Sequence, residues 1–186
     1  NGVKVILVIR DPRDVITSLN VGKGTEYGGD HRPTLFHIRN WRKSVAVANT
    51  FSDNPDCTVL RYEDLVHEQD LVLSKLCKFL NIKPFGKDAF ENGIPTVKGE
   101  MWEGNSSTGK QQGINATNIG KYKKYLNAEM VSFIESLCFP EMKSYNYILD
   151  NEDHEINYSF REPFEISECG LDPNMSSNQS ELDKES

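Results

Sequence analysis

The sequence contains no long hydrophobic run, because none of its apolar stretches approaches the roughly 18 residues that a membrane helix needs. It also contains no signal-like segment, and it begins with Asn1 rather than methionine, so we expect a fragment of a longer protein. A chain of 186 residues is long enough for one domain with a sizeable core. These properties indicate a soluble globular domain with no membrane segment in this chain.

A basic excess of the size that nucleic-acid binding requires is also missing. The formal net charge is −7, but residues 150–186 alone contain 11 acidic and two basic residues. The residues before position 150 contain 19 basic and 17 acidic residues, a balance that excludes nucleic acid as a partner but allows a local anion pocket. The acidic segment has few core-forming residues, although Tyr158, Phe160 and Phe164 are able to dock locally. We therefore predict a partial domain over 1–149 and a disordered acidic tail over 150–186.

The four cysteines form no Cys-x-x-Cys pair and have no metal-like spacing against the four histidines, so we expect no metal site. Cys77 and Cys138 fall at apolar positions of expected helices, which favours core thiols over a disulfide. Five Asn-x-Ser/Thr sequons would suit a secretory-pathway protein, but an asparagine-rich chain also produces such matches by chance. The compartment stays open between the cytoplasm and the Golgi lumen.

The most informative stretch present lies near the N-terminus, where Val5 to Ile9 are continuously apolar and mostly β-branched. This pattern predicts a strand covered on both faces in a parallel α/β sheet, with Arg10 at its carboxyl end. Asp11 is a good N-cap and Pro12 suits the first helical position, so a helix should begin there with free N–H groups beside the arginine. Ser18 lies about two helical turns further on, on the same face. Ligands of open α/β sheets bind at this edge, so we predict an anion site here.

The sequence Arg-Asp-Pro-Arg-Asp, followed by a serine eight residues after the first arginine, resembles the 3'-phosphate-binding motif of sulfotransferases. These enzymes use 3'-phosphoadenosine 5'-phosphosulfate as the sulfuryl donor. The resemblance implies that Arg10 and Ser18 hold the 3'-phosphate of the nucleotide. The alternative is that Arg10 is a strand-end arginine paired with an acid and that Ser18 is an ordinary helix serine.

A second strand is predicted over residues 58–62, and it ends in Tyr62-Glu63-Asp64-Leu65. A strand with this ending about 50 residues beyond the arginine motif also resembles sulfotransferases, and the resemblance places Tyr62 against the adenine side of the nucleotide. An aromatic ring offers stacking area there, and its hydroxyl offers a polar contact. The alternative is a core tyrosine, with Asp64 capping the next helix.

Three longer helices are predicted from apolar residues that recur every three to four positions. The first covers 34–51 with Leu35, Ile38, Trp41, Val45 and Ala48 on one face. The second covers 71–80 and stops at Asn81. The third covers 127–142, and its apolar stripe contains Met130, Phe133, Ile134, Leu137 and Cys138.

Two further segments carry the resemblance. The loop Trp102 to Ser107 is similar to a family loop that reaches the nucleotide, which implies a binding role for Ser106; a surface turn is the alternative. The segment Asn118 to Leu126 is similar to the family's Gly-x-Trp-Lys segment and implies that Lys121 faces the 3'-phosphate; a solvated helix-surface lysine is the alternative. Tyrosine replaces the usual tryptophan, and the Arg-Lys-Gly triplet of cytosolic members is absent.

The resemblance extends over residues 3 to 148 and implies a P-loop-NTPase-like parallel sheet flanked by helices, of which this chain contains an incomplete part. The family's Pro-Lys-Ser-Gly-Thr-type loop, which binds the 5'-phosphosulfate, and its catalytic base would lie upstream of Asn1. We therefore assign no catalytic residue and expect this chain alone to be inactive. The implied enzyme transfers a sulfuryl group to a hydroxyl or amine of a small-molecule or glycan acceptor. A non-catalytic nucleotide-binding or interaction domain and a P-loop kinase relative remain alternatives, and the oligomeric state is open.

Overall fold

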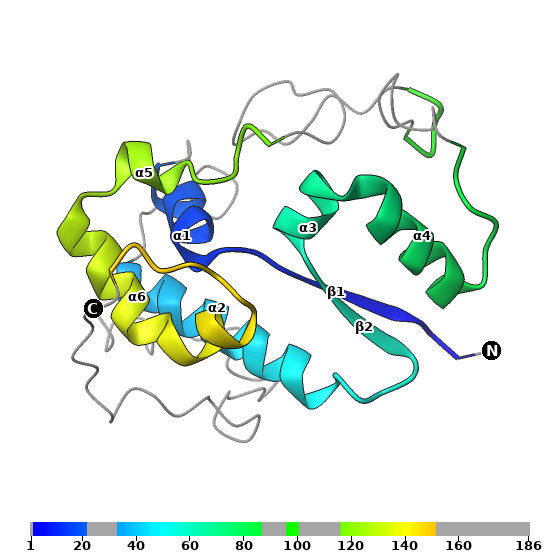
Figure 1. Cartoon of the computed structure of the whole chain (residues 1–186), viewed down its shortest axis with the longest axis horizontal. Coiled ribbons are helices and arrows are strands. Elements are labelled where there is room, and N and C mark those ends of the chain that lie inside the picture. The colour runs from blue at the N-terminus through cyan, green and yellow to red at the C-terminus, as the bar shows by residue number, and fades with distance from the viewer. Residues whose placement is uncertain (1, 22–32, 87–95, 101–115, 152–186) are drawn as a thin grey trace.

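The computed structural model describes residues 2–21, 33–86, 96–100 and 116–151, which form a layered arrangement of helices around a pair of strands (Figure 1). The strands are β1 (Val5–Ile9) and β2 (Cys57–Arg61). The helices are α1 (Pro12–Val21), α2 (Thr34–Thr50), α3 (Tyr62–His67), α4 (Gln69–Leu80), α5 (Tyr122–Tyr125) and α6 (Ala128–Ser144).

Strands β1 and β2 pair in parallel, in a register that aligns Val5 with Cys57 and Ile9 with Arg61. The prediction of a parallel α/β sheet is confirmed, and both carboxyl ends meet at one edge, where α1 and α3 begin. The expectation that β1 is covered on both faces is wrong for the described residues, because Val5 is 43% exposed and Val8 57% exposed. The described sheet has two strands, so β1 has a neighbouring strand on one side alone within that part of the chain.

Helix α1 begins where the sequence predicts. The Oδ1 atom of Asp11 accepts a hydrogen bond of 2.9 Å from the backbone N–H of Arg13, and Pro12 occupies the first helical position. At the other end of the fold, α4 stops at Asn81, which adopts a left-handed conformation with φ of 54°. Asparagine is one of the few residues other than glycine that adopts this conformation at low cost.

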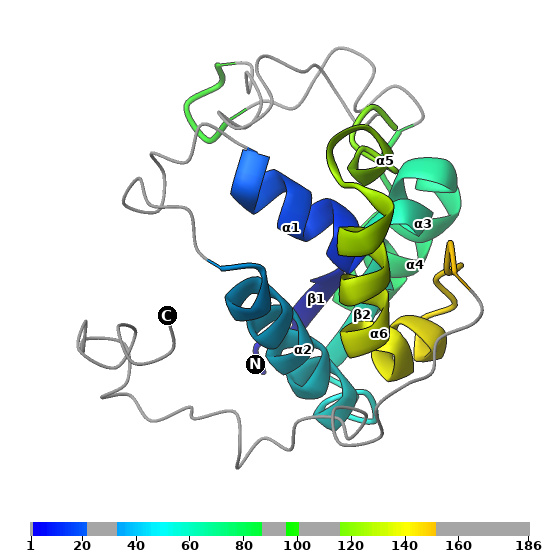
Figure 2. The same cartoon turned by 90° about the vertical axis from the view of Figure 1, so that its left-hand side faces the viewer.

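The strand pair lies between α4 on one side and helices α2 and α6 on the other (Figures 1 and 2). The core consists of apolar side chains from β1, α1, α2 and α6, which include Ile9, Ile16, Ile38, Trp41, Val45, Ile134, Cys138 and Met142. Two residues of the predicted apolar faces do not lie in the core: Leu35 is 45% exposed and Phe133 is 42% exposed. Leu35 lies in the first turn of α2, and Phe133 is rotated by about 100° from Ile134, which points into the core.

The second strand is shifted by one residue from its prediction, and a short helix follows it at once. Tyr62 is therefore the first residue of α3 rather than the last of β2, and it is half-buried rather than a core residue. Asp64 lies in the first turn of α3, and Glu68 occupies the N-cap position of α4 that the sequence assigned to Asp64 as an alternative.

The described cysteines carry free thiols, with Cys77 and Cys138 buried as expected for core residues and Cys57 half-buried. Burial raises the pKa of the Cys138 thiol well above its ordinary value, and the nearby carboxylate of Glu141 adds to the effect.

Candidate anion-binding site

Arg10 follows β1 directly and lies at the edge where the carboxyl ends of both strands meet. Its backbone carbonyl accepts a hydrogen bond of 2.8 Å from Nε1 of Trp41 on α2, which anchors the strand end. The guanidinium carbon is 4.8 Å from the ring centroid of Tyr62, and Nη2 donates to the backbone carbonyl of Asn118. Nη2 is also 3.6 Å from Oδ2 of Asp14. The cation therefore contacts two segments that are distant in the sequence, at Tyr62 and Asn118, and one residue of the following helix, Asp14.

The Nε atom of Arg10 is buried and has no hydrogen-bond partner within the described residues. The whole side chain retains an exposed fraction of 21%. A buried guanidinium N–H without an acceptor is unfavourable, because it has lost its water without a replacement. An anionic oxygen at this position would satisfy it, so the arginine fits the phosphate role that the resemblance implies.

Glu63 connects the two strand ends, and sequence reasoning did not single it out. Its Oε1 atom accepts a hydrogen bond of 2.9 Å from the backbone N–H of Asp11, and Oε2 accepts one of 3.1 Å from the Tyr147 hydroxyl. Burial raises the pKa of Tyr147, and the charge of Glu63 raises it further, so this phenol is a donor at neutral pH. The signal available in the sequence was a carboxylate placed directly after a strand, beside the aromatic Tyr62.

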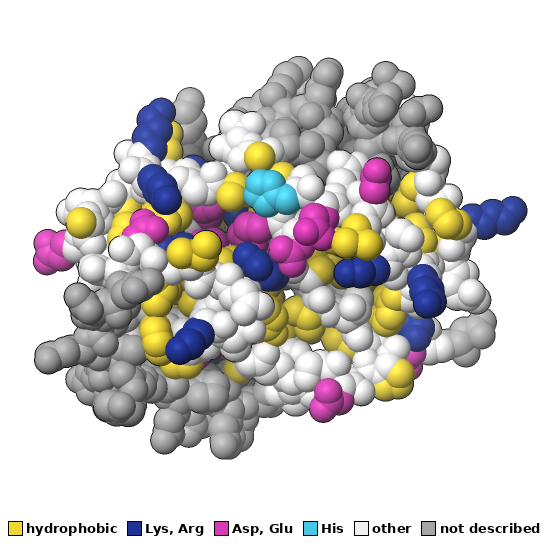
Figure 3. Space-filling model, in the orientation of Figure 1, with side chains coloured by type: hydrophobic (Ala, Val, Ile, Leu, Met, Phe, Trp, Pro, Cys, Tyr) yellow, Lys and Arg dark blue, Asp and Glu magenta, His cyan; other side chains and the backbone are white. Residues whose placement is uncertain are grey.

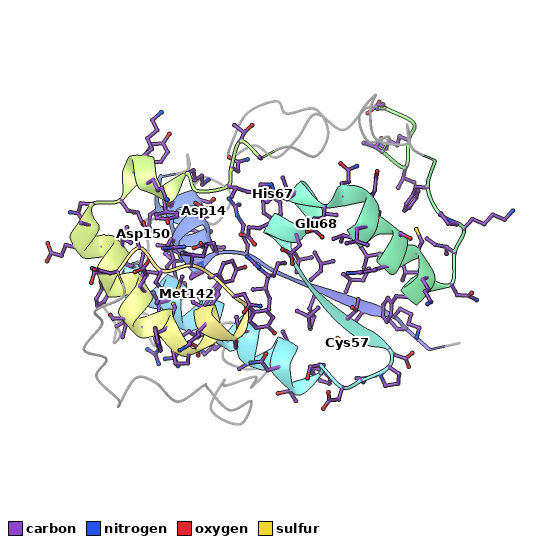
Figure 4. All side chains as sticks on the ribbon, viewed as in Figure 1. Asp14, Cys57, His67, Glu68, Met142 and Asp150 are labelled. Atoms are coloured by element: carbon purple, nitrogen blue, oxygen red, sulfur yellow. The ribbon has the colours of Figure 1, made fainter. Side chains whose placement is uncertain are left out.

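Asp14 connects α1 to the segment that carries Lys121. Its side chain is 1% exposed, and it accepts hydrogen bonds from the backbone N–H groups of Gly120 at 2.7 Å and Tyr122 at 3.0 Å. Figure 4 shows Asp14 on α1 where the chain before α5 approaches. Gly120 has φ of +73°, a conformation that favours glycine. The segment of 120–122 is therefore held against the first turn of α1.

Lys121 is brought next to Arg10 by this contact. Burial lowers the pKa of Lys121, the positive charge of Arg10 lowers it further, and the Asp14 carboxylate opposes the shift. The structure thus brings Lys121 and Tyr62, two of the residues singled out from the sequence, to Arg10. Lys121 is half-buried just before α5, so the alternative of a fully solvated helix lysine does not describe it.

Ser18 lies one turn beyond Asp14 on α1. Its Oγ donates a hydrogen bond of 2.9 Å to the Asp14 backbone carbonyl, a common arrangement for a serine within a helix. The partners of Arg10 in the described structure do not include Ser18. Ser106, the remaining predicted binding residue, lies outside the described residues.

A buried ionic network also surrounds Arg13 near the start of α1, and sequence reasoning did not identify it. Arg13 is 3% exposed and pairs with Asp11 at 2.6 Å and with Glu135, which is fully buried on α6. Glu135 also accepts the backbone N–H groups of Asp150 at 2.8 Å and Asn151 at 3.2 Å. The two residues after the predicted boundary at 149 therefore contact the folded part of the chain. Figure 4 shows Asp150 beside α5 and α6.

Acidic and basic side chains lie side by side near the middle of the face shown in Figure 3, between α1 and α3. Within the described residues no group of three or more His, Cys, Asp or Glu side chains is arranged to hold a metal ion. No helix in the described ranges is both long enough and apolar enough to cross a membrane.

A cavity of about 220 Å³ lies between β2, α4 and Tyr145, and its lining does not include Arg10, Tyr62 or Lys121.

Parallel strands with an arginine, a lysine and an aromatic ring gathered at their carboxyl edge define an α/β domain of the kind that binds ligands at that edge. The match to a family model identifies the family within this class of α/β domains. The chain belongs to the sulfotransferase domain family, whose model matches residues 1–146.

One solved structure with the same fold is the sulfotransferase domain from the curacin biosynthetic pathway, at 24% sequence identity and a TM-score of 0.52. The match covers 78% of this chain and 54% of that chain, so this chain spans about half the length of that domain. Among curated protein sequences, none matches the chain.

Proposed function

We propose that this chain forms the part of a sulfotransferase that binds the 3'-phosphate and adenine side of 3'-phosphoadenosine 5'-phosphosulfate. The observation that carries the proposal is the convergence of Arg10, Lys121 and Tyr62 at the carboxyl edge of a parallel strand pair. Membership of the sulfotransferase family supports it independently.

The three residues offer different interactions to the nucleotide. Arg10 supplies a planar fork of N–H donors that matches phosphate oxygens, and its unpartnered Nε lies within that fork. Lys121 supplies a compact second charge; burial lowers its pKa, and the positive charge of Arg10 lowers the pKa further. Tyr62 offers ring area near the guanidinium. Ser18 and Ser106 join this set through the family resemblance.

The bound nucleotide would supply the sulfuryl group, which moves to a hydroxyl or amine of a small-molecule or glycan acceptor. The residues of this chain bind and orient the donor, and they place positive charge around its 3'-phosphate. We propose that the chain is the C-terminal portion of the domain, because the segments that resemble the family are those that follow its 5'-phosphosulfate loop; a match to 54% of the curacin-pathway chain is compatible with a partial domain. The 5'-phosphosulfate loop and the catalytic base would then come from sequence before Asn1.

A test compares adenosine 3',5'-bisphosphate with adenosine 5'-monophosphate by calorimetric titration of the full chain. We expect tighter binding of the bisphosphate, and we expect Arg10→Lys to reduce the preference by about ten- to a hundredfold. Lysine keeps the charge but loses the fork, which costs roughly 1.5 to 3 kcal/mol for one charge-assisted hydrogen bond.

The matched control is Arg61→Lys. Arg61 is aligned with Ile9 at the end of the neighbouring strand. Its guanidinium lies 4.5 Å from the ring centroid of Tyr147, an arrangement similar to that of Arg10 and the Tyr62 ring. The control should keep the preference for the bisphosphate. Equal affinity of the unaltered chain for the two nucleotides would refute the proposed function and leave Arg10 as a strand-end ion pair. A non-catalytic binding domain would pass this test, and turnover by the complete protein separates it from an enzyme.

A further inference from the structure

The buried carboxylate of Asp14 has a set of partners that suggests a role beyond folding. Its two oxygens accept the backbone N–H groups on either side of Lys121, one from Gly120 and one from Tyr122. The same carboxylate faces Nη2 of Arg10 at 3.6 Å. One side chain thus contacts the lysine-bearing turn and the arginine at once.

We propose that Asp14 is the positioning residue that holds Lys121 beside Arg10, so that two cations that are distant in the sequence meet one 3'-phosphate. The inference rests on the proposed function, because the phosphate is the ligand that both cations would share.

Geometry supports a role in positioning over one in charge balance alone. Lys121 itself donates no hydrogen bond to Asp14 in the described structure, and the carboxylate reaches its segment through backbone groups instead. Two N–H bonds from residues on either side of Lys121 fix the turn in place and in orientation. The left-handed φ of +73° at Gly120 is what lets both N–H groups point to one carboxylate.

Electrostatics explains why the turn needs to be held. Burial disfavours the positive charge of Lys121, and repulsion from Arg10 disfavours it further. Asp14 offsets part of this repulsion. It also occupies the first turn of α1, where the helix dipole favours a carboxylate.

Two substitutions separate the hydrogen bonds that Asp14 accepts from the effect of its negative charge. Asp14→Asn keeps the shape but presents one acceptor oxygen and one donor group, so one of the two N–H groups faces another donor. Asp14→Glu keeps the charge but moves the carboxylate outward by one methylene, away from its place between the two N–H groups. A positioning role predicts a loss in both variants, whereas a role through charge alone predicts no loss in Asp14→Glu.

The readout is the ratio of affinities for adenosine 3',5'-bisphosphate and adenosine 5'-monophosphate, measured on the full chain. Both nucleotides bind the folded population, so the folded fraction cancels in this ratio, and a destabilised variant does not change it for that reason alone. We expect the ratio to fall by about ten- to a hundredfold in Asp14→Glu and Asp14→Asn, as for the loss of one charge-assisted contact. Glu141→Gln is the matched control, because it alters another buried carboxylate, paired with Arg42 on α2, and should keep the ratio.

A double-mutant cycle with Lys121→Ala tests whether Asp14 acts through the lysine. We expect Asp14→Glu to lower the ratio in the unaltered chain and to have little further effect once Lys121 is alanine. An equal loss in both backgrounds would overturn the inference, because Asp14 would then act on Arg10 instead. An unchanged ratio in Asp14→Glu would overturn it as well.

Amide hydrogen exchange distinguishes failure of this inference from failure of the proposed function. In the ligand-free chain the amides of Gly120 and Tyr122 should exchange at least about tenfold faster in Asp14→Glu than in Glu141→Gln, since they lose their acceptor. A bisphosphate preference in the unaltered chain that survives in Asp14→Glu would overturn the inference alone. Equal affinity of the unaltered chain for both nucleotides would remove the proposed function and this inference together, whatever the exchange rates.

Discussion

Replacing Glu135 by glutamine should destabilise the chain more than the loss of one ordinary ion pair would. The carboxylate is fully buried, and it pairs with Arg13, which is itself 3% exposed. Removing one partner of a buried pair costs roughly 3 to 5 kcal/mol, because the other charge stays buried without full compensation. Arg13 keeps its 2.6 Å contact with Asp11, so we expect the lower end of this range, about 3 kcal/mol.

The assay is urea denaturation of the full chain followed by circular dichroism, with a thermal scan as a second measurement. A loss of about 3 kcal/mol should lower the thermal midpoint by about 6 to 12 °C for a chain of this size. The control is Asp56→Asn, which breaks the pair between Lys4 and Asp56. That pair has the same 2.6 Å separation as Arg13 and Asp11, but its side chains are 36% and 51% exposed. An exposed pair is worth at most about 1 kcal/mol.

Salt gives a second way to separate the two pairs. In about 0.5 M salt, screening should reduce the small destabilisation by Asp56→Asn further. The destabilisation by Glu135→Gln should persist, because buried pairs are screened much less. A loss below about 1 kcal/mol for Glu135→Gln would refute the reasoning that burial decides the energy of these pairs.

Three further predictions concern activity, the tail and acid stability. The chain alone should show no turnover in a radiolabelled-donor assay, since the 5'-phosphosulfate loop and base are expected elsewhere; measurable turnover would contradict this. Truncation after Asn151 should leave the thermal midpoint within about a few degrees of that of the full chain, because the contacts of Asp150 and Asn151 with Glu135 are kept. A larger drop would show that the tail packs on the domain. Burial raises the pKa of Glu141 despite the opposing charge of Arg42, so the native state binds this proton more tightly than the unfolded state does. Stability should therefore fall as the pH rises from the ordinary carboxyl pKa to the raised one, and Glu141→Gln should remove this dependence in pH-resolved denaturation.

Local sequence rules located most of the secondary structure. The start of α1 at Pro12 depends on Asp11, the end of α4 depends on Asn81, and both follow from the capping chemistry of adjacent residues. The position of Arg10 followed in the same way from a strand that leads into a helix. The family resemblance, rather than a local rule, assigned Tyr62 to the nucleotide, and the parallel pairing of β1 and β2 places it at the same edge as Arg10.

Long-range pairing was beyond those rules. The roles of Asp14 and Glu63 depend on which backbone N–H groups lie opposite them, and those groups come from residues about 50 to 100 positions away. The Arg13 network was hidden for the same reason, since a charged residue in a helix is by default a surface residue. The exposure of Val5 and Val8 was mispredicted because an apolar run indicates a buried strand without saying which elements of the chain cover it.

The two hydrogen bonds of Asp14 have a consequence for the order of events during synthesis. They join residues 106 and 108 positions apart, so a ribosome that adds roughly 5 to 20 residues per second makes Tyr122 about 5 to 20 s after Asp14. During that interval the nascent chain already carries Arg10 and the start of α1, but the turn that brings Lys121 to them does not yet exist. We therefore expect the nascent chain to be unable to hold the nucleotide through both cations until the segment before α5 has left the ribosome and closed a long loop.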